Sequence, residues 1–363
     1  MKEEFRDSVA SVLKAECDTL RLHAYVDGRN NLDLDLWEHA TQLGWLGAIV
    51  EEEFDGLGQD FSMIPLFHRE FGHYLAAGDF ISTHTFTATL QAINDADFSK
   101  QYLPALAAGR IKPLVPVTDD HIALEVKDGV LRGISGPLLG PAGASIGAVR
   151  ATAENGDPAI AIVDTDTRGC TINDLPVLDQ TRRKLYTLEC SDLQPLVVLQ
   201  DDRFKRADRA LNTSGRLATA SDSIGVGYRA LESTVAYLSE RQQFGRPIAS
   251  LQAIQHRCAN IAKDLKLAQC QLEAALAQLL NGDDDGNDSA TWIALAKAEC
   301  DEASTQAAAE SIQLHGGVGF TWEYDCHFFL HRTRLNEQFF GSPNDLRGDA
   351  LDRLTSDFRP TSQ

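Results

Sequence analysis

The sequence is poor in positive charge. Its 363 residues include 33 lysines and arginines against 53 aspartates and glutamates, which gives a formal net charge of -20. A protein that binds nucleic acid needs a face rich in lysine and arginine, so this balance argues against nucleic acid as a partner. It also disfavours adhesion to an anionic membrane.

Long apolar runs are missing as well. No run approaches the ~20 residues that a membrane-spanning helix needs. The first residues, MKEEFRDS, contain no hydrophobic core of a secretion signal. We therefore expect a cytoplasmic protein without a membrane partner.

Cysteines are few and do not form motifs. None of the seven belongs to a C-x-x-C pair: Cys17, Cys170, Cys190, Cys258, Cys270, Cys300 and Cys326. Disulfide frameworks and zinc sites show paired cysteines at regular spacing. We therefore expect buried, reduced thiols and no metal site.

What the sequence does have is three segments of different character. Residues 1–112 show apolar residues at helical spacing, for example Phe5, Val9, Val12, Leu13 and Leu20. Residues 113–205 contain short β-branched runs separated by proline, glycine and aspartate, which predict a small antiparallel β domain. Residues 206–363 repeat apolar residues at steps of three, four and seven, which predicts a C-terminal four-helix bundle. The predicted fold class is α+β.

Three patterns that mark sites in other proteins are interpreted as structural. Residues 281–288 (NGDDDGND) lack the glycine and the final glutamate of a calcium loop, so we expect a solvated loop. Residues 143–147 (GASIG) match a nucleophile elbow, but a strand rather than a helix is predicted after Ser145. His315 is expected to pack or to donate a hydrogen bond, and His327 and His331 have no metal-like partners.

Two separate segments carry the chemistry of a dinucleotide site. The first is R241-Q-Q-F-G-R-P-I248, in which Arg241 ends a predicted helix and can fork onto pyrophosphate oxygens. The second is Q313-L-H-G-G-V-G319, in which Gln313 offers a donor and an acceptor and the paired glycines allow a close approach of the backbone. Alone, the first segment is equally compatible with a helix-capping arginine and a core phenylalanine.

Taken together, these segments resemble the FAD-holding parts of acyl-CoA dehydrogenases. The resemblance covers nearly the whole chain, includes Gly44–Gly47 and Glu51–Gly58, and is strongest from Arg216 to Arg334. It implies FAD as cofactor and an electron-transfer flavoprotein as electron acceptor. It also implies an oligomer, because the arginine–phenylalanine segment of the family reaches a neighbouring subunit's flavin. The residues implied to bind the cofactor are Arg241, Gln243, Phe244, Gln313, Gly316 and Gly317.

The catalytic base that the resemblance requires is missing. The family removes a proton from the carbon beside a thioester and passes hydride to flavin, which needs a carboxylate base. One implied base position is Gly215, beside the matching Arg216, and the other is Gly341. Neither glycine can take up a proton.

The implied contacts to the flavin ring are also depleted. Val117–Asp120 runs directly into His121–Lys127, where the family carries a glycine- and serine-rich segment. An expected tryptophan is replaced near Pro137, and an expected threonine-containing stretch reads Ser342–Asp345.

We therefore predict the non-catalytic subunit of a heteromeric acyl-CoA dehydrogenase, similar to the α2β2 heterotetramers of bacterial steroid side-chain β-oxidation. Such a subunit lends its adenine- and pyrophosphate-binding residues to a catalytic partner that turns over the acyl-CoA substrate. One alternative is a self-sufficient homotetramer with a displaced base, for which Asp222 and Glu337 are candidates. The other is a flavin-free scaffold that keeps only the fold. Gly215, Gly225 and Gly227 would admit a bulky acyl group or serve helix contacts, and the sequence does not decide between them.

Overall fold

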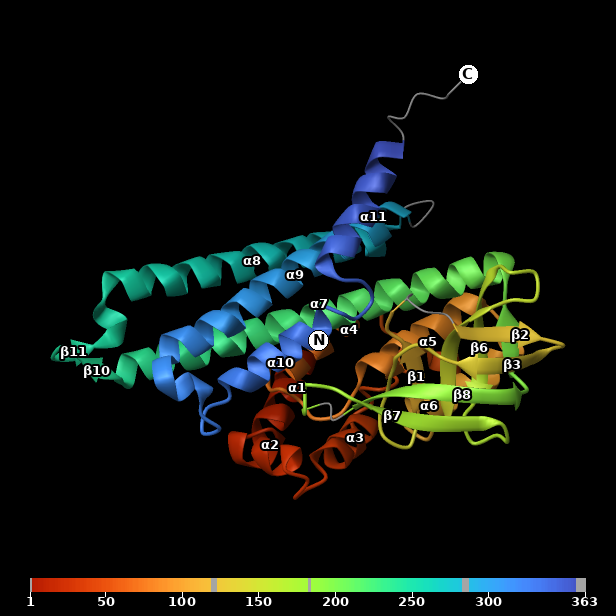
Figure 1. Ribbon diagram of the computed structural model, residues 1–363, viewed down its shortest axis with the longest axis horizontal. Helices are drawn as coiled ribbons and strands as arrows, with labels where there is room; N and C mark the ends of the chain where they lie inside the picture. Colours follow the sequence, from red (N-terminus) through yellow and green to blue (C-terminus); the bar gives the residue numbers. More distant parts are fainter. Residues whose placement is uncertain (1, 119–122, 182–183, 283–286, 357–363) are drawn as a thin grey trace.

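The computed structural model describes residues 2–118, 123–181, 184–282 and 287–356 (Figure 1). Its first part is helical: α1 (Lys2–Glu16), α2 (Thr19–Val26), α3 (Leu32–Gln42), the short 3-10 turn η1 (Glu52–Phe54), α4 (Met63–His73), α5 (Ile81–Ile93) and α6 (Ala96–Ala107). The apolar residues from Phe5 to Leu20 are helical, as predicted, but they do not lie on one helix. The first helix ends at Glu16, the Asp18 side chain caps the N-terminus of α2, and Leu20 is 82% exposed.

The middle part is a sheet: β1 (Pro113–Pro116), β2 (Ala123–Lys127), β3 (Val130–Ile134), β4 (Leu138–Leu139), β5 (Ile146–Thr152), β6 (Pro158–Asp164), β7 (Cys170–Pro176), β8 (Lys184–Leu193) and β9 (Val197–Leu199). Its order is β1-β4-β8-β3-β2-β5-β6-β9, and β7 pairs with β8. Because β1 also pairs with β5, the path closes on itself around an apolar core that includes Leu114, Val149 and Leu188.

The prediction of a purely antiparallel region is wrong. Strand β5 runs parallel to β1 and, at one residue pair, to β2. The local pattern of short β-branched runs is the same for both orientations, so it identified the strands but not their directions.

The last part consists of long helices: α7 (Asp201–Glu240), α8 (Gln252–Asn281), α9 (Asn287–His315), α10 (Cys326–Asn336) and α11 (Pro343–Ser356). A small hairpin of β10 (Gln242–Gln243) and β11 (Arg246–Pro247) and the turn η2 (Ile248–Ser250) join α7 to α8, and η3 (Gly316–Phe320) follows α9. Figure 1 shows α7 running from the sheet and α5 at one end to the hairpin at the other. Among the described residues, no helix combines the length and apolarity that a membrane crossing requires.

The glycines of α7 serve helix packing. A Cβ at Gly225 would lie 2.0 Å from the carbonyl oxygen of Arg69 on α4, and one at Gly227 would lie 2.5 Å from Leu265 on α8. Gly72 on α4 approaches the backbone of Asp222 in the same way. Close contact between α4, α7 and α8 therefore explains Gly225 and Gly227, and no ligand is needed to account for them.

Candidate functional site

The first predicted cofactor segment forms an exposed hairpin at one end of the helical bundle. Helix α7 ends at Glu240, and Arg241 follows it in extended conformation. Gln243 pairs with Arg246, and the turn between them places Phe244 (φ 53°) and Gly245 (φ 76°) in the left-handed region. Phe244 is 89% exposed, so its ring points away from the rest of the chain. The hairpin itself was not predicted, because Phe-Gly is not one of the dipeptides typical of such turns.

The second segment lies at the same end of the bundle (Figure 1). Gln313, Gly316 and Gly317 are exposed. Among the described residues, chain neighbours aside, no atom lies within 4 Å of the Cβ that Gly316 or Gly317 would carry. His315 is buried, and its Nδ1–H donates to the carbonyl oxygen of Ser311 at 2.7 Å. Burial lowers the pKa of His315. The prediction that His315 packs and hydrogen-bonds is confirmed.

One aromatic contact joins the two segments. The rings of His315 and Tyr237 stack with centroids 4.4 Å apart, and Tyr324 meets both rings at an angle. Tyr237 also accepts, through its backbone carbonyl, the N–H of Arg241 at 2.9 Å. The stack therefore holds the end of α7 against the end of α9. Tyr237 lies one turn before Arg241, and His315 lies two residues after Gln313.

The two glycines at the implied base positions lie in one place. A Cβ at Gly215 would come within 2.5 Å of the ring of Phe340, the residue before Gly341. Phe340 is 3% exposed and has a left-handed backbone (φ 56°), which is unusual for a bulky residue. An aromatic ring therefore fills the space beside Gly215.

Three hydrogen bonds hold this strained segment. The Phe340 N–H donates to the Val117 carbonyl oxygen at 2.6 Å, and Arg216 Nε donates to the Phe340 carbonyl oxygen at 3.0 Å. Lys297 Nζ donates to the Gly341 carbonyl oxygen at 3.1 Å. Sequence reasoning missed Phe340, although an aromatic pair directly before Gly341 was a visible signal.

The two candidate displaced bases are engaged in ion pairs. Asp222 is 1% exposed and accepts both Nε (2.9 Å) and Nη2 (2.8 Å) of Arg332, together with Asn336 Nδ2 at 2.8 Å. Glu337 is mostly buried and accepts from Arg334 at 2.9 Å. Arg332 thus binds both oxygens of the Asp222 carboxylate, whereas Glu337 accepts one hydrogen bond from the exposed Arg334.

The implied flavin-ring segment is described only in part. Residues 119–122, where the shortened stretch lies, are outside the described residues. Val117 donates its N–H to the Pro137 carbonyl oxygen at 3.3 Å, and its own carbonyl is taken by Phe340. Ser342 Oγ donates to Asp345 and accepts the Asp345 N–H, which caps the start of α11. The backbone groups of Val117 and the hydroxyl of Ser342 therefore form hydrogen bonds with other groups of the same chain.

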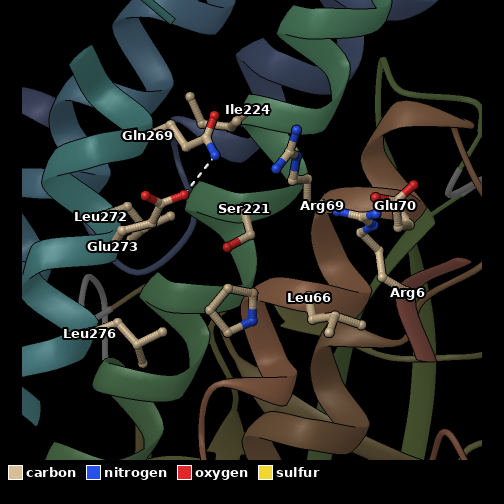
Figure 2. A pocket seen from close by; sticks show the side chains of 11 residues that line it. Arg6, Leu66, Arg69, Glu70, Ser221, Ile224, Gln269, Leu272, Glu273 and Leu276 are labelled. Carbon is tan, nitrogen blue, oxygen red and sulfur yellow. Dashed lines mark hydrogen bonds between the residues drawn. The ribbon is translucent and has the colours of Figure 1, made fainter. Parts of the chain in front are cut away.

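Two hollows lie along α7, away from its end at the hairpin. The first, of about 200 Å³, is lined by Arg6 of α1, by α4 and by α8, with Arg6 and Glu70 on one side and Gln269 and Glu273 on the other (Figure 2). It is smaller than the roughly 300–1,000 Å³ of typical ligand pockets. The second, of about 570 Å³, is lined by residues of α5, the 49–61 segment and the first turns of α7, including Arg206 and Arg209. It shares no residue with the predicted cofactor segments.

The remaining sequence predictions have mixed outcomes. A strand, β5, follows Ser145 as predicted. The 281–288 segment falls partly outside the described residues. Within the described ranges, no cluster of three or more histidine, cysteine, aspartate or glutamate residues could hold a metal ion. The expectation that the cysteines are buried is wrong for Cys270, which is exposed on α8.

Comparisons with known proteins agree with this architecture. Residues 1–110 match the model of the acyl-CoA dehydrogenase N-terminal domain, and residues 204–354 match the C-terminal domain. The acyl-CoA dehydrogenase IpdE2 of Mycolicibacterium smegmatis is 27% identical over 95% of this chain and 96% of its own length. A solved variant of the Tcur3481-Tcur3483 steroid ACAD superimposes with a TM-score of 0.85 at 22% identity, covering 99% of both chains. The ChsE4-ChsE5 complex of Mycobacterium tuberculosis gives a TM-score of 0.82 at 19% identity, covering 100% of this chain and 98% of that one. With both domain models matched in order around the observed sheet, the chain belongs to the acyl-CoA dehydrogenase family, whose cofactor is FAD.

Proposed function

We propose that this chain is the non-catalytic subunit of a heteromeric FAD-dependent acyl-CoA dehydrogenase. The observation that carries the proposal is the contact between Gly215 and Phe340. A dehydrogenase of this family needs a carboxylate beside the acyl group, and here a buried aromatic ring fills the space next to both implied base positions. Loss of a general base typically lowers the rate by ~10²–10⁴-fold.

The described residues fit one half of FAD. Arg241 presents five exposed N–H donors for pyrophosphate oxygens, and Gln313 offers an amide donor and acceptor for adenine. The open space around Gly316 and Gly317 allows a ligand to approach the backbone. When bound, the flavin supplies the acceptor for the hydride. This chain's residues hold its pyrophosphate and adenine, together with Gln243 and Phe244.

The exposure of these groups supports a partner subunit. Phe244 has almost no contact within its own chain, and the hairpin lies at the end of the bundle away from the sheet (Figure 1). The exposed Phe244 ring is therefore available for contact with a second subunit, as the family resemblance implies for this segment. We propose that a catalytic subunit in an α2β2 heterotetramer supplies the flavin-ring site and the base. An electron-transfer flavoprotein would then take the electrons.

For the substrate, we propose an acyl-CoA ester with a bulky side chain such as that of a steroid. The support is the likeness to the steroid ACAD and to a two-component complex, both at the level of the fold. Assay of the assembled complex against steroid side-chain and straight-chain acyl-CoA esters tests this point, and preference for short straight chains would contradict it.

Purification of the chain with and without its partner tests the subunit role. We expect the chain alone to hold little FAD and to reduce no dye with acyl-CoA, and the assembled complex to do both. Stoichiometric FAD and dye reduction by the chain alone would instead establish the self-sufficient homotetramer.

A matched pair of variants tests the flavin contact. Arg241→Ala should lower the FAD content and the dehydrogenase rate of the complex without dissociating it. Arg246→Ala, on the same exposed hairpin, is the control and should leave both unchanged. If the Arg241→Ala complex keeps its flavin and its rate, the flavin-free scaffold becomes the better account.

A further inference from the structure

Two cysteines face each other across the edge of the sheet. Strand β7 pairs with β8 in antiparallel register, and Cys170 is directly opposite Cys190. Strand β7 lies off the main path of the sheet, paired with β8. The two cysteines are too far apart in the sequence to form a C-x-x-C motif.

The hydrogen-bond pattern decides how close the two side chains are. Ser191 donates its N–H to the Gly169 carbonyl oxygen at 2.8 Å, so residues 169 and 191 form a hydrogen-bonded pair of the ladder. The next pair, Cys170 and Cys190, is therefore of the non-hydrogen-bonded kind, in which the Cα atoms are about 4.5 Å apart and the side chains approach most closely. That separation lies within the roughly 4.4–6.8 Å range of disulfide-bonded cysteines.

The two thiols differ in environment. Cys190 is 3% exposed and belongs to the core of the sheet, whereas Cys170 is only partly buried at the edge. The hydrogen bond between the thiols lowers the pKa of Cys170 and raises the pKa of Cys190, and burial raises the latter further. Cys170 is thus both the more accessible and the more readily ionised sulfur, which makes it the attacking nucleophile.

We propose that Cys170 and Cys190 form a redox-modification site that hydrogen peroxide converts to a cross-strand disulfide. The Cys170 thiolate attacks one peroxide oxygen, the O–O bond breaks, and a sulfenic acid forms with loss of hydroxide. The Cys190 sulfur then attacks the Cys170 sulfur, the S–O bond breaks, and the Cys190 proton leaves with the departing hydroxyl as water. In total, two thiols and one peroxide give one disulfide and two waters.

The bond would secure the connection from the sheet to the helices. After β7 the chain continues to Asp179 and Thr181, and Thr181 Oγ1 accepts Arg332 Nη1 at 2.8 Å. Asp179 lies 3.7 Å from the same guanidinium. A disulfide that closes the loop from 170 to 190 restricts the unfolded chain and holds β7 on β8. This inference is independent of the subunit role proposed above.

Peroxide titration of the full-length protein, alone and in its complex, tests the site. After alkylation of the remaining thiols, mass spectrometry should find the peptides of Cys170 and Cys190 joined with the loss of two hydrogens. Dithiothreitol should reverse the bond. The thermal midpoint of the oxidised protein should be higher than that of the reduced protein.

Cysteine variants separate the two steps. In Cys190→Ser, peroxide should leave a sulfenic acid at Cys170 that dimedone traps, and Cys170→Ser should leave Cys190 as a free thiol. Cys270→Ser, which removes an exposed thiol, is the control and should still form the bond. Two results would overturn the proposal: sulfenic or sulfinic acid at Cys170 of the unaltered protein with Cys190 still free, or faster loss of Cys270 than of Cys170. Should Cys190→Ser fail to fold, Cys190→Ala gives the same readout.

Discussion

The ring of Phe340 lies against the bare backbone of Gly215, where a Cβ would come within 2.5 Å of it. The Phe340 ring can occupy this position only because residue 215 has no side chain, and the ring in turn fills the space that a side chain at 215 would take. Since hydrogen bonds from Arg216 and to Val117 fix the Phe340 backbone, the ring has little freedom to withdraw.

Gly215→Ala should consequently destabilise the chain. We expect the free energy of unfolding to fall by about 1–3 kcal/mol, the usual result of overpacking a buried site. Urea unfolding measures it. Gly348→Ala is the control, because Gly348 lies in α11 with open space around its Cβ position and should be neutral or slightly stabilised.

A second substitution shows whether the ring is responsible. In the Phe340→Leu background, Gly215→Ala should be less destabilising, and a double-mutant cycle gives the coupling energy. Equal losses in both backgrounds would mean that the ring does not occupy the Gly215 space in solution. For the same reason, Gly215→Glu alone should not restore a catalytic base.

The pair of Asp222 and Arg332 gives a second prediction. Asp222→Asn removes the carboxylate that accepts two hydrogen bonds from the buried Arg332 guanidinium, while Asp179 stays 3.7 Å from that guanidinium. We expect a loss of about 3 kcal/mol in the free energy of unfolding, because one of the two carboxylates beside the buried charge remains. Asp202→Asn is the control, because its ion pair with Lys205 is exposed and should contribute at most about 1 kcal/mol. If Asp222 were instead a displaced base, Asp222→Asn would abolish turnover and leave stability nearly unchanged.

The stack of Tyr237 on His315 predicts that FAD binding depends on a residue that is not itself a proposed flavin contact. Tyr237→Leu removes the stack that joins the ends of α7 and α9, so Arg241 and Gln313 should lose their relative position. The FAD content of the assembled complex should fall, though less than with Arg241→Ala. Val235→Leu, a change at a half-exposed position of α7, is the control. Unchanged FAD content in Tyr237→Leu would show that the two segments act separately.

Local patterns in the sequence predicted the helices of the bundle, because helical spacing acts over a few residues. The cofactor role of the segments around Arg241 and Gln313 stays a prediction. Local patterns did not predict Phe340 against Gly215 or Arg332 against Asp222. Both contacts join residues more than a hundred positions apart, and no periodicity encodes such pairs.

Short-range errors had other causes. The spacing of Phe5, Val9, Val12, Leu13 and Leu20 does not show that Asp18 caps a new helix before Leu20. The sequence does not show which strands pair or in which direction they run, so the parallel pairing of β1 and β5 was missed. The register of β7 on β8, which places Cys170 opposite Cys190, was missed for the same reason.

A buried histidine pair predicts how stability depends on pH. His84 is fully buried on α5, its Nε2–H donates to the Trp45 carbonyl oxygen at 2.9 Å, and its Nδ1 accepts from His68 Nε2 at 3.0 Å. Burial lowers the pKa of His84 from 6.5 to about 4. The unfolded chain therefore takes up a proton at this histidine more readily than the folded chain does. The contribution of neutral His84 to the free energy of unfolding is complete above pH 6.5 and is lost as the pH falls towards 4.

Between pH 7 and pH 5 this histidine should lower the free energy of unfolding by about 2 kcal/mol. Thermal or urea unfolding across that range measures the slope. His84→Gln keeps a donor for Trp45 and an acceptor for His68 but does not titrate, so its slope should be shallower than that of the unaltered protein. His256→Gln replaces an exposed histidine on α8 and should leave the slope unchanged. Equal slopes for His84→Gln and the unaltered protein would mean that His84 is accessible to protons in the folded state.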